Sequence, residues 1–125
     1  MHRSRLTAVL VDVPHEQYRK VIDFWSGALG DRPESDEEDP DYASLGQPVP
    51  GLQFMVQQVD ADARIHLDIE TDDVEAEVAR LEQLGAERVE KIDTWWVMRD
   101  PAGVLFCVVR VQDPASFESG ARSFG

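Results

Sequence analysis

A pattern of strands and one amphipathic helix occurs twice along this chain of 125 residues, and this repetition most constrains its fold. The first helix pattern ends in ALGDR, Ala28 to Arg32, and the second ends in QLGAER, Gln83 to Arg88, at a spacing of 55 residues. Two copies of one unit are expected to pack together. Each helix needs a sheet face to cover, and the opposite sheet faces must cover one another or enclose something. The sequence therefore predicts one α+β domain over residues 1–125.

The first half begins with a strand at Leu6 to Val13, where aliphatic and β-branched residues dominate and Pro14 closes the run. From His15 onward, apolar residues recur at three- and four-residue spacing, which predicts a helix that stops at Gly30. Residues 31–41 are acidic and contain two prolines, so we expect a surface loop there. Two short strands are predicted after this loop, at 42–45 and 52–59.

The second half starts with RIHLDIE, Arg64 to Glu70, which alternates with the period of a strand. Asp72 or Asp73 can cap the following helix, which we expect to end at Gly85. Strands are predicted at 94–99 and 104–111, joined by a DPAG turn with proline at its second position. The final residues, 112–125, form a tail that we expect to fray or to dock weakly.

The alternation in RIHLDIE places two sets of side chains on opposite faces of the strand. Ile65, Leu67 and Ile69 form an aliphatic set that can be buried. His66, Asp68 and Glu70 share the other face, which is either in contact with solvent or part of a site.

Composition limits the classes of partner. The formal charge of −13 argues against nucleic acid and anionic membrane surfaces, because both carry the same sign as the protein. Acidic residues can serve solubility alone, while neutral or cationic small molecules stay open as ligands. The single cysteine, Cys107, excludes an intramolecular disulfide, and neither a signal peptide nor a membrane span is apparent. We therefore expect a soluble, cytoplasmic protein.

Three segments resemble the vicinal oxygen chelate superfamily, and especially its glyoxalase-like and bleomycin resistance proteins. They are DFWSGALG in the first half, RIHLDIETDDVEAEVARLEQLGAE in the second, and WWVMRDPAGVLFCVV near the end. The resemblance covers most of residues 6 to 111. It implies two paired βαβββ modules, at about 6–60 and 64–111, which form a curled mixed sheet with a central cleft. It also implies a homodimer.

The resemblance further implies four inward-facing positions that bind one divalent ion in metal-dependent members. His66 matches the histidine of the second module, and Cys107 stands where the family has a glutamate, seven residues after Asp100. Gln53 stands at the family's carboxylate position. The fourth position falls among Thr7, Ala8 and Val9, none of which is a usual metal ligand. Only His66 is retained, so we expect no resident metal; a divalent ion held by a reduced ligand set is the alternative.

Small-molecule pockets usually combine apolar walls with a few convergent polar groups, and six residues are our candidates for such a site. They are Gln53, Met55, His66, Asp68, Trp95 and Cys107. His66 is either a polar anchor or general base, or a histidine satisfied by Asp68 or by the backbone. Aligning the DPAG segment with the family implies that Trp95 faces the cleft. There it either stacks on a flat or cationic ligand or fills the space itself.

Two functions follow from this set. The first is binding or sequestering a small organic molecule, with cationic or aromatic molecules as candidates, without the family's full metal site. The second is catalysis by a glyoxalase-type lyase or isomerase, for which His66 is the candidate catalytic residue and a divalent ion the cofactor. The role of Asp12 is also open, because it is either a group at the cleft rim or a turn residue before Pro14.

Overall fold

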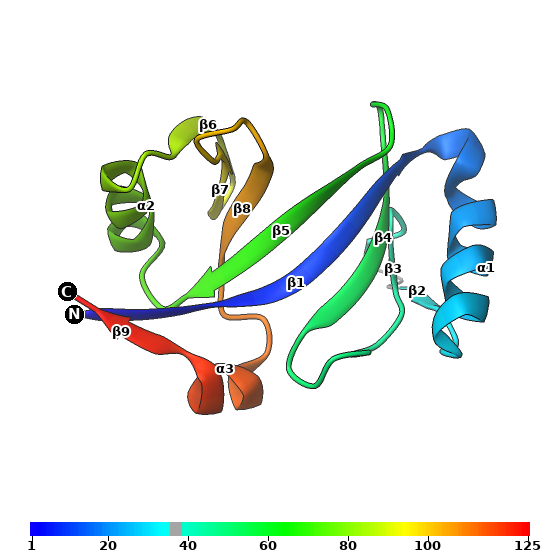
Figure 1. Cartoon of the computed structure of the whole chain (residues 1–125), viewed down its shortest axis with the longest axis horizontal. Helices are drawn as coiled ribbons and strands as arrows, with labels where there is room; N and C mark the ends of the chain where they lie inside the picture. Colours follow the sequence, from blue (N-terminus) through cyan, green and yellow to red (C-terminus); the bar gives the residue numbers. More distant parts are fainter. Residues whose placement is uncertain (36–38) are drawn as a thin grey trace. The chain divides into compact units, whose positions relative to one another are not determined.

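The computed structural model of the chain describes residues 1–35 and 39–125, and it confirms the predicted α+β class. The chain divides into two compact units (Figure 1). We call residues Ala8–His66 the inner unit, and Met1–Thr7 together with Leu67–Gly125 the terminal unit. Two strands, β1 (His2–Pro14) and β5 (Arg64–Thr71), contribute residues to both units. The predicted acidic loop at 31–41 lies partly outside the described residues, at 36–38.

The inner unit contains four strands in the order β2-β3-β4-β1. β4 (Gln53–Val59) runs parallel to β1 and antiparallel to β3 (Tyr42–Ser44), which pairs in turn with the two-residue strand β2 (Glu34–Ser35). β2 lies inside the segment that we expected to be loop. A short 3-10 helix, His15–Gln17, leads into α1 (Tyr18–Leu29), which ends as predicted at Gly30 with a positive φ of 75°.

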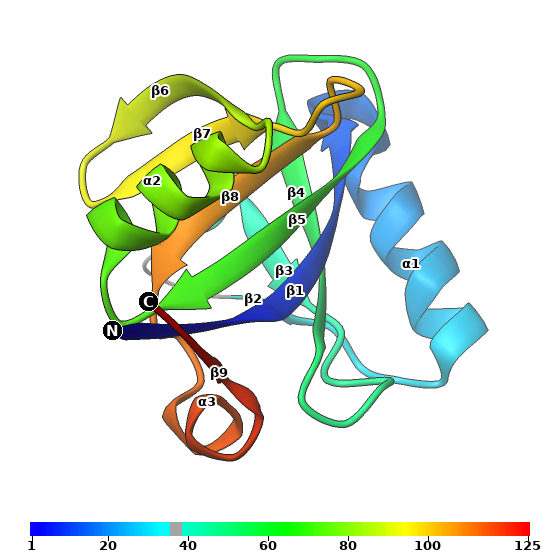
Figure 2. The same cartoon turned by 60° about the vertical axis from the view of Figure 1, so that its left-hand side comes forward.

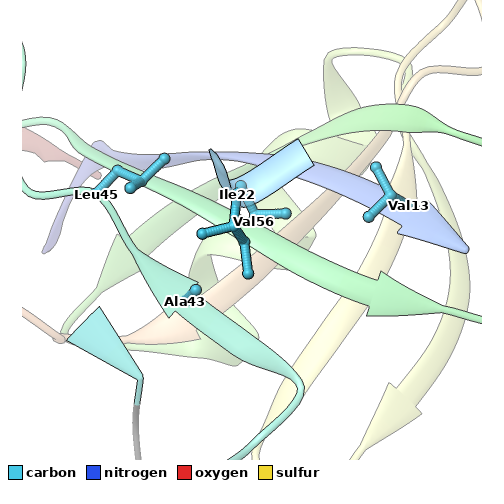
Figure 3. Packing of buried hydrophobic residues seen from close by; sticks show 5 residues of the cluster. All are labelled: Val13, Ile22, Ala43, Leu45 and Val56. Atoms are coloured by element: carbon cyan, nitrogen blue, oxygen red, sulfur yellow. The ribbon is translucent and has the colours of Figure 1, made fainter. Parts of the chain in front are cut away.

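Helix α1 covers one face of the inner sheet. Its residue Ile22 lies beside Val56 of β4 and belongs to the same buried cluster as Val13 of β1 (Figure 3). The alternation of β4 therefore turns Phe54 and Val56 toward the helix and Gln53 to the other face. The opposite face carries Gln53 together with Ala8 and Leu10, both of which are buried.

The terminal unit has the strand order β5-β8-β7-β6. β8 (Leu105–Arg110) runs parallel to β5 and antiparallel to β7 (Trp95–Arg99), and β6 (Glu87–Ile92) forms the edge. The sequence analysis did not predict β6. All six of its residues are exposed, so burial imposes no apolar period on its sequence.

Helix α2 (Val74–Gln83) covers one face of the terminal sheet and begins at Asp73, whose carboxylate accepts a hydrogen bond from the amide of Ala76 at 3.1 Å. Val78 packs against Met98 and Phe106, and Trp96 lies beside this cluster. Trp96 and Met98 therefore lie on the side of β7 that packs with the α2 cluster. No helix within residues 1–35 and 39–125 is long and apolar enough to cross a membrane.

The C-terminal tail docks instead of fraying. Helix α3 (Pro114–Gly120) buries Phe117, and β9 (Arg122–Phe124) pairs antiparallel with the first residues of β1. The two termini therefore lie side by side (Figure 2). The sequence does not predict this docking, because the tail is held by charged side chains that lie far from it in the chain.

The two faces of β5 differ from the simple amphipathic expectation. Leu67 and Ile69 pack against the α2 cluster as predicted, but Ile65 is 57% exposed. On the polar face, His66 and Glu70 are buried. The polar face of β5 is therefore not a solvent-facing surface at His66 and Glu70.

Candidate functional site

The polar face of the inner sheet lies opposite α1 and is built from β1 and β4. Their parallel register pairs Ala8 with Gln53, Leu10 with Met55, and Asp12 with Gln57. Directly paired residues project to the same side of a sheet. Gln53 and Met55, two of the predicted site residues, therefore share a face with Asp12.

Asp12 is the central buried charge of this face. The residue lies within the aliphatic run from Ala8 to Val13 and is only 1% exposed. His66 approaches Asp12 through Nδ1, which lies 2.6 Å from Oδ2, and the Nε of Arg64 lies 3.3 Å from the same oxygen. Oδ1 of Asp12 is buried and has no hydrogen-bond partner among the described residues.

The Asp12–His66 contact bears on the alternative that the sequence left open for Asp12. Asp12 is not merely a turn residue, because it lies inside β1 and contacts a second strand. His66 has Asp12 as a hydrogen-bond partner. The two residues are 54 positions apart, so the local sequence around either one does not indicate this contact. An ionised carboxylate can only accept hydrogen bonds, so Nδ1 of His66 is the donor in this pair.

The other predicted site residues lie in the terminal unit, on the sheet face opposite α2. The strand register pairs Asp68 with Cys107, and Cys107 with Val97 of β7. Trp95 lies two residues before Val97 and so projects from the same face of β7. Asp68, Cys107 and Trp95 are all partly buried.

Glu70, the third polar residue of β5, has its carboxylate bound by other parts of the terminal unit. Its Oε1 accepts a hydrogen bond from Nε of Arg5 at 2.8 Å, and its Oε2 accepts from the backbone amides of Gln112 and Asp113 at 2.7 and 3.1 Å. Glu70 therefore attaches both β1 and the C-terminal tail to β5. This carboxylate therefore serves the fold.

An apolar pocket of about 270 Å³ occupies a different part of the terminal unit. It lies beside the end of α2 and the DPAG turn, and Leu81, Pro101 and Val104 are among its walls. The sequence analysis did not find it. None of the six predicted site residues lines this pocket.

The sequence and the fold were next compared with known proteins. A family model described as "Glyoxalase-like domain" matches residues 8–109, which is most of the chain. The chain belongs to the glyoxalase-like domain family. The resemblance to the vicinal oxygen chelate superfamily is thereby confirmed, although no curated protein matches this glyoxalase-like domain.

Solved structures similar to this glyoxalase-like domain share its fold at low sequence identity. A hypothetical protein from Bacillus halodurans is 14% identical with a TM-score of 0.65, covering 88% of this chain and 96% of its own. Methylmalonyl-CoA epimerase from Mycobacterium tuberculosis is 18% identical with a TM-score of 0.59, covering 89% and 90%. A Mn(II)-bound glyoxalase from Novosphingobium aromaticivorans is 18% identical with a TM-score of 0.58, covering 90% of this chain and 43% of its own.

The metal positions implied by the family can be tested against these residues. Gln53 is paired directly with Ala8, so the first module offers one neutral amide and one methyl group where two donors are expected. A divalent transition metal normally requires three or four protein donors. The first module of this glyoxalase-like domain therefore offers no charged donor at these two positions.

Two potential donors lie side by side in the terminal unit, because Cys107 on β8 is the register partner of Asp68 on β5. His66 precedes Asp68 by two residues along β5. Nitrogen, oxygen and sulfur donors suit zinc better than calcium or magnesium. The hydrogen bond from His66 to Asp12 is also the kind of carboxylate contact that orients metal-binding histidines.

Proposed function

We propose that this glyoxalase-like domain binds a small organic molecule on the polar sheet face that contains Asp12 and His66. The observation that carries the proposal is the buried, hydrogen-bonded carboxylate–imidazole pair on a sheet face shared with Gln53 and Met55. Such a face combines apolar surface with a few polar groups, as ligand sites usually do. Binding of this kind needs no metal.

The cost of burying Asp12 supports the proposal. A carboxylate loses favourable hydration inside a protein, and an aliphatic residue at this position would avoid that loss. Neighbouring positions of β1 are filled by aliphatic residues, so Asp12 is an exception within its own strand. Buried charged groups next to a titratable partner are more frequent at functional sites than elsewhere. We infer that Asp12 is retained for its effect on His66.

The chemistry of the ligand follows from charge and from the remaining candidate residues. The formal charge of −13 favours a neutral or cationic molecule over an anionic one. Asp68, Trp95 and Cys107 stay predicted ligand residues in the terminal unit. An indole ring such as that of Trp95 would suit a flat or cationic group.

A thermal-shift screen of neutral and cationic aromatic compounds tests this proposal. A ligand at 100 times its dissociation constant stabilises the folded state by about 2.7 kcal/mol and raises the melting temperature. We expect His66→Ala to weaken the binding of any hit at least about tenfold, which corresponds to about 1.4 kcal/mol. The matched control is His15→Ala, because the imidazole of His15 is 59% exposed and lies outside this face. Equal binding by both variants would reject the proposed location.

The second candidate function is metal-dependent lyase or isomerase chemistry with a reduced ligand set. It is favoured by Asp68 of β5 and Cys107 of β8, which are register partners in the terminal unit. A metal ion there would act as a Lewis acid toward substrate oxygens. Asp68 and Cys107 would be among the residues that hold it.

Elemental analysis distinguishes the two functions. If the second is correct, protein purified without chelators contains about one zinc or other transition ion per chain, and Asp68→Asn and Cys107→Ser each lower that content. Asp100→Asn is unsuitable as a control because Asp100 orders a turn, so Asp62→Asn on the exposed loop is used instead. Metal-free protein that gains no stability from added zinc would eliminate the metal-dependent function. A homodimer and a cytoplasmic location remain predictions from the sequence.

A further inference from the structure

We propose that the apolar pocket beside the end of α2 is a second binding site, which takes a small hydrophobic amine. The apolar body of the ligand lies in the pocket, and its ammonium group pairs with the carboxylate of Asp100. All of the lining residues belong to the terminal unit, and neither Asp12 nor His66 is among them. This site is therefore distinct from the polar face to which the proposed function belongs.

The floor of the pocket is the apolar face of the terminal sheet. Leu67 and Ile69 of β5 and Phe106 of β8 line it, on the face that packs with α2. Helix α2 ends at Gln83, and Gly85 then redirects the chain with a positive φ of 112°, a conformation that suits glycine. Leu67 and Ile69 are only partly buried, so apolar surface of the sheet stays accessible beside the helix end.

The walls of the pocket are held in place by backbone hydrogen bonds. On the helix side, the amides of Leu84 and Ala86 donate to the carbonyl of Leu81 at 3.1 and 3.0 Å. On the side of the DPAG turn, the amide of Asp100 donates to the carbonyl of Val104 at 2.9 Å. Ligand pockets are usually formed before the ligand arrives. The pocket meets this condition, because both of its walls are fixed without a ligand.

The volume of the pocket limits the size of the ligand. The pocket encloses about 270 Å³. An apolar cavity of about 150 Å³ with similar walls stays dry and binds benzene, whereas drug-sized ligands occupy pockets of about 300–1,000 Å³. One aromatic ring or a short alkyl chain, with a single small polar substituent, therefore matches the space.

The mouth of the pocket is apolar and open to solvent. Leu6, Leu84 and Val104 line the pocket and are 43%, 67% and 48% exposed. Apolar side chains that gather at one exposed place often mark a binding site, because covering them removes apolar surface from water. A ligand can enter through this mouth, and its apolar body gains contact with these three side chains.

Asp100 determines the polar group of the ligand. Nine of the ten lining residues are apolar, and Asp100 is the tenth. Its Oδ1 accepts hydrogen bonds from the amides of Ala102 and Val104 at 2.8 and 2.9 Å, which fixes the carboxylate. Its Oδ2 has no partner within residues 1–35 and 39–125 and is free to accept from an ammonium group. An anionic ligand is disfavoured by this carboxylate and by the formal charge of −13.

Benzylamine, benzyl alcohol and benzoate test the ligand class, since they are similar in size and differ in charge. Carbon-13 NMR of the methyl groups of Leu67, Ile69 and Leu81 reports binding in the pocket. We expect benzylamine to bind at least about threefold more tightly than benzyl alcohol and at least about tenfold more tightly than benzoate. In Asp100→Asn the preference for the amine should disappear, because asparagine keeps an acceptor oxygen for the turn but loses the charge.

Val104→Phe tests the location by filling the mouth of the pocket. We expect it to weaken benzylamine binding at least about tenfold. The matched control is Val89→Phe, which adds the same ring at a position of β6 that is 43% exposed and does not line the pocket. His66→Ala should leave benzylamine binding unchanged. Urea denaturation verifies that each variant folds.

Four results would overturn the proposal. Equal binding of the three probes would reject the amine, and no binding of any probe at millimolar concentration would reject the site. Benzylamine binding that is lost in His66→Ala but kept in Val104→Phe would assign the amine to the polar face instead. A dimer that Val104→Phe dissociates in sedimentation experiments would assign the pocket to a second copy of the chain. If Asp100→Asn does not fold, the three affinities in the wild-type protein still decide the ligand class.

Discussion

Replacing Glu77 with glutamine is expected to lower the free energy of unfolding by about 3 kcal/mol, because it breaks a buried charged network by removing one partner. Glu77 lies on α2 and is fully buried. Its Oε1 accepts from Nε of Arg80 at 2.7 Å and lies 2.8 Å from Nε2 of His2, while its Oε2 accepts from Oγ of Ser4 at 2.7 Å. Urea denaturation at neutral pH measures the change.

The stability that Glu77 contributes also depends on pH. Burial by itself raises the pKa of Glu77, but hydrogen bonds from Arg80, His2 and Ser4 outweigh it and hold the pKa below its ordinary value of 4.5. A depressed folded-state pKa means that the contribution is complete above the unfolded pKa and is lost as pH falls through the folded one. The wild type should therefore lose this part of its stability below about pH 4.5, whereas Glu77→Gln should not.

The matched control is Glu82→Gln on the same helix, because the carboxylate of Glu82 is 40% exposed and pairs only with Arg88 among the described residues. Exposed pairs contribute at most about 1 kcal/mol. Equal destabilisation by the two substitutions would contradict the assignment of Glu77 as the buried centre of this network.

This network illustrates what the sequence could predict and what it could not. The apolar period of α2 predicts the helix, and Asp73 is one of two capping residues that its start offers. Glu77 and Arg80, three positions apart, read as an ordinary exposed pair on such a helix. Nothing local indicates that His2 and Ser4 lie against them, because this contact depends on where β1 runs in the folded chain.

The candidate site follows the same division. The alternation of β4 predicts that Gln53 and Met55 project from the sheet face opposite α1. The packing of Phe54 and Val56 in the cluster with α1 agrees. The contact between Asp12 and His66 joins residues 54 positions apart, so no periodicity contains it. One signal was present, since a carboxylate within the aliphatic run LVDV must find a partner if the strand is buried. That rule predicts a partner but does not identify His66 or Arg64.

The polar face of β5 shows why residues with the same periodicity can have different roles. His66 faces Asp12 in the inner unit, and Asp68 is the register partner of Cys107 in the terminal unit. Glu70 instead binds Arg5 and the chain before α3. The sequence predicts the shared face for all three, but the partner of each decides whether it serves the site or the fold.

Replacing Glu70 with glutamine is therefore expected to cost about 3 kcal/mol of stability and to release the tail, while leaving the imidazole of His66 unchanged. Glu70 is fully buried, and Arg5 is 11% exposed, so loss of the carboxylate charge leaves the guanidinium without its closest partner in a site with little water. The amides of Gln112 and Asp113 also exchange a charged acceptor for a neutral one. Urea denaturation measures the stability, and amide hydrogen exchange at residues 112–125 measures the release of the tail.

A double-mutant cycle with Arg5→Met separates the ion pair from the tail contacts. Removing both charges is less costly than the sum of the two single changes if the pair is coupled, and we expect a coupling of about 1–3 kcal/mol. Hydrogen exchange at Gln112 should quicken in Glu70→Gln but much less in Arg5→Met, because the amide of Gln112 bonds directly to Glu70. Glu118→Gln is the control, since Glu118 is 79% exposed and lies on α3 itself. If Glu118→Gln releases the tail as readily as Glu70→Gln, the tail is held by surface charge and not by the buried carboxylate of β5.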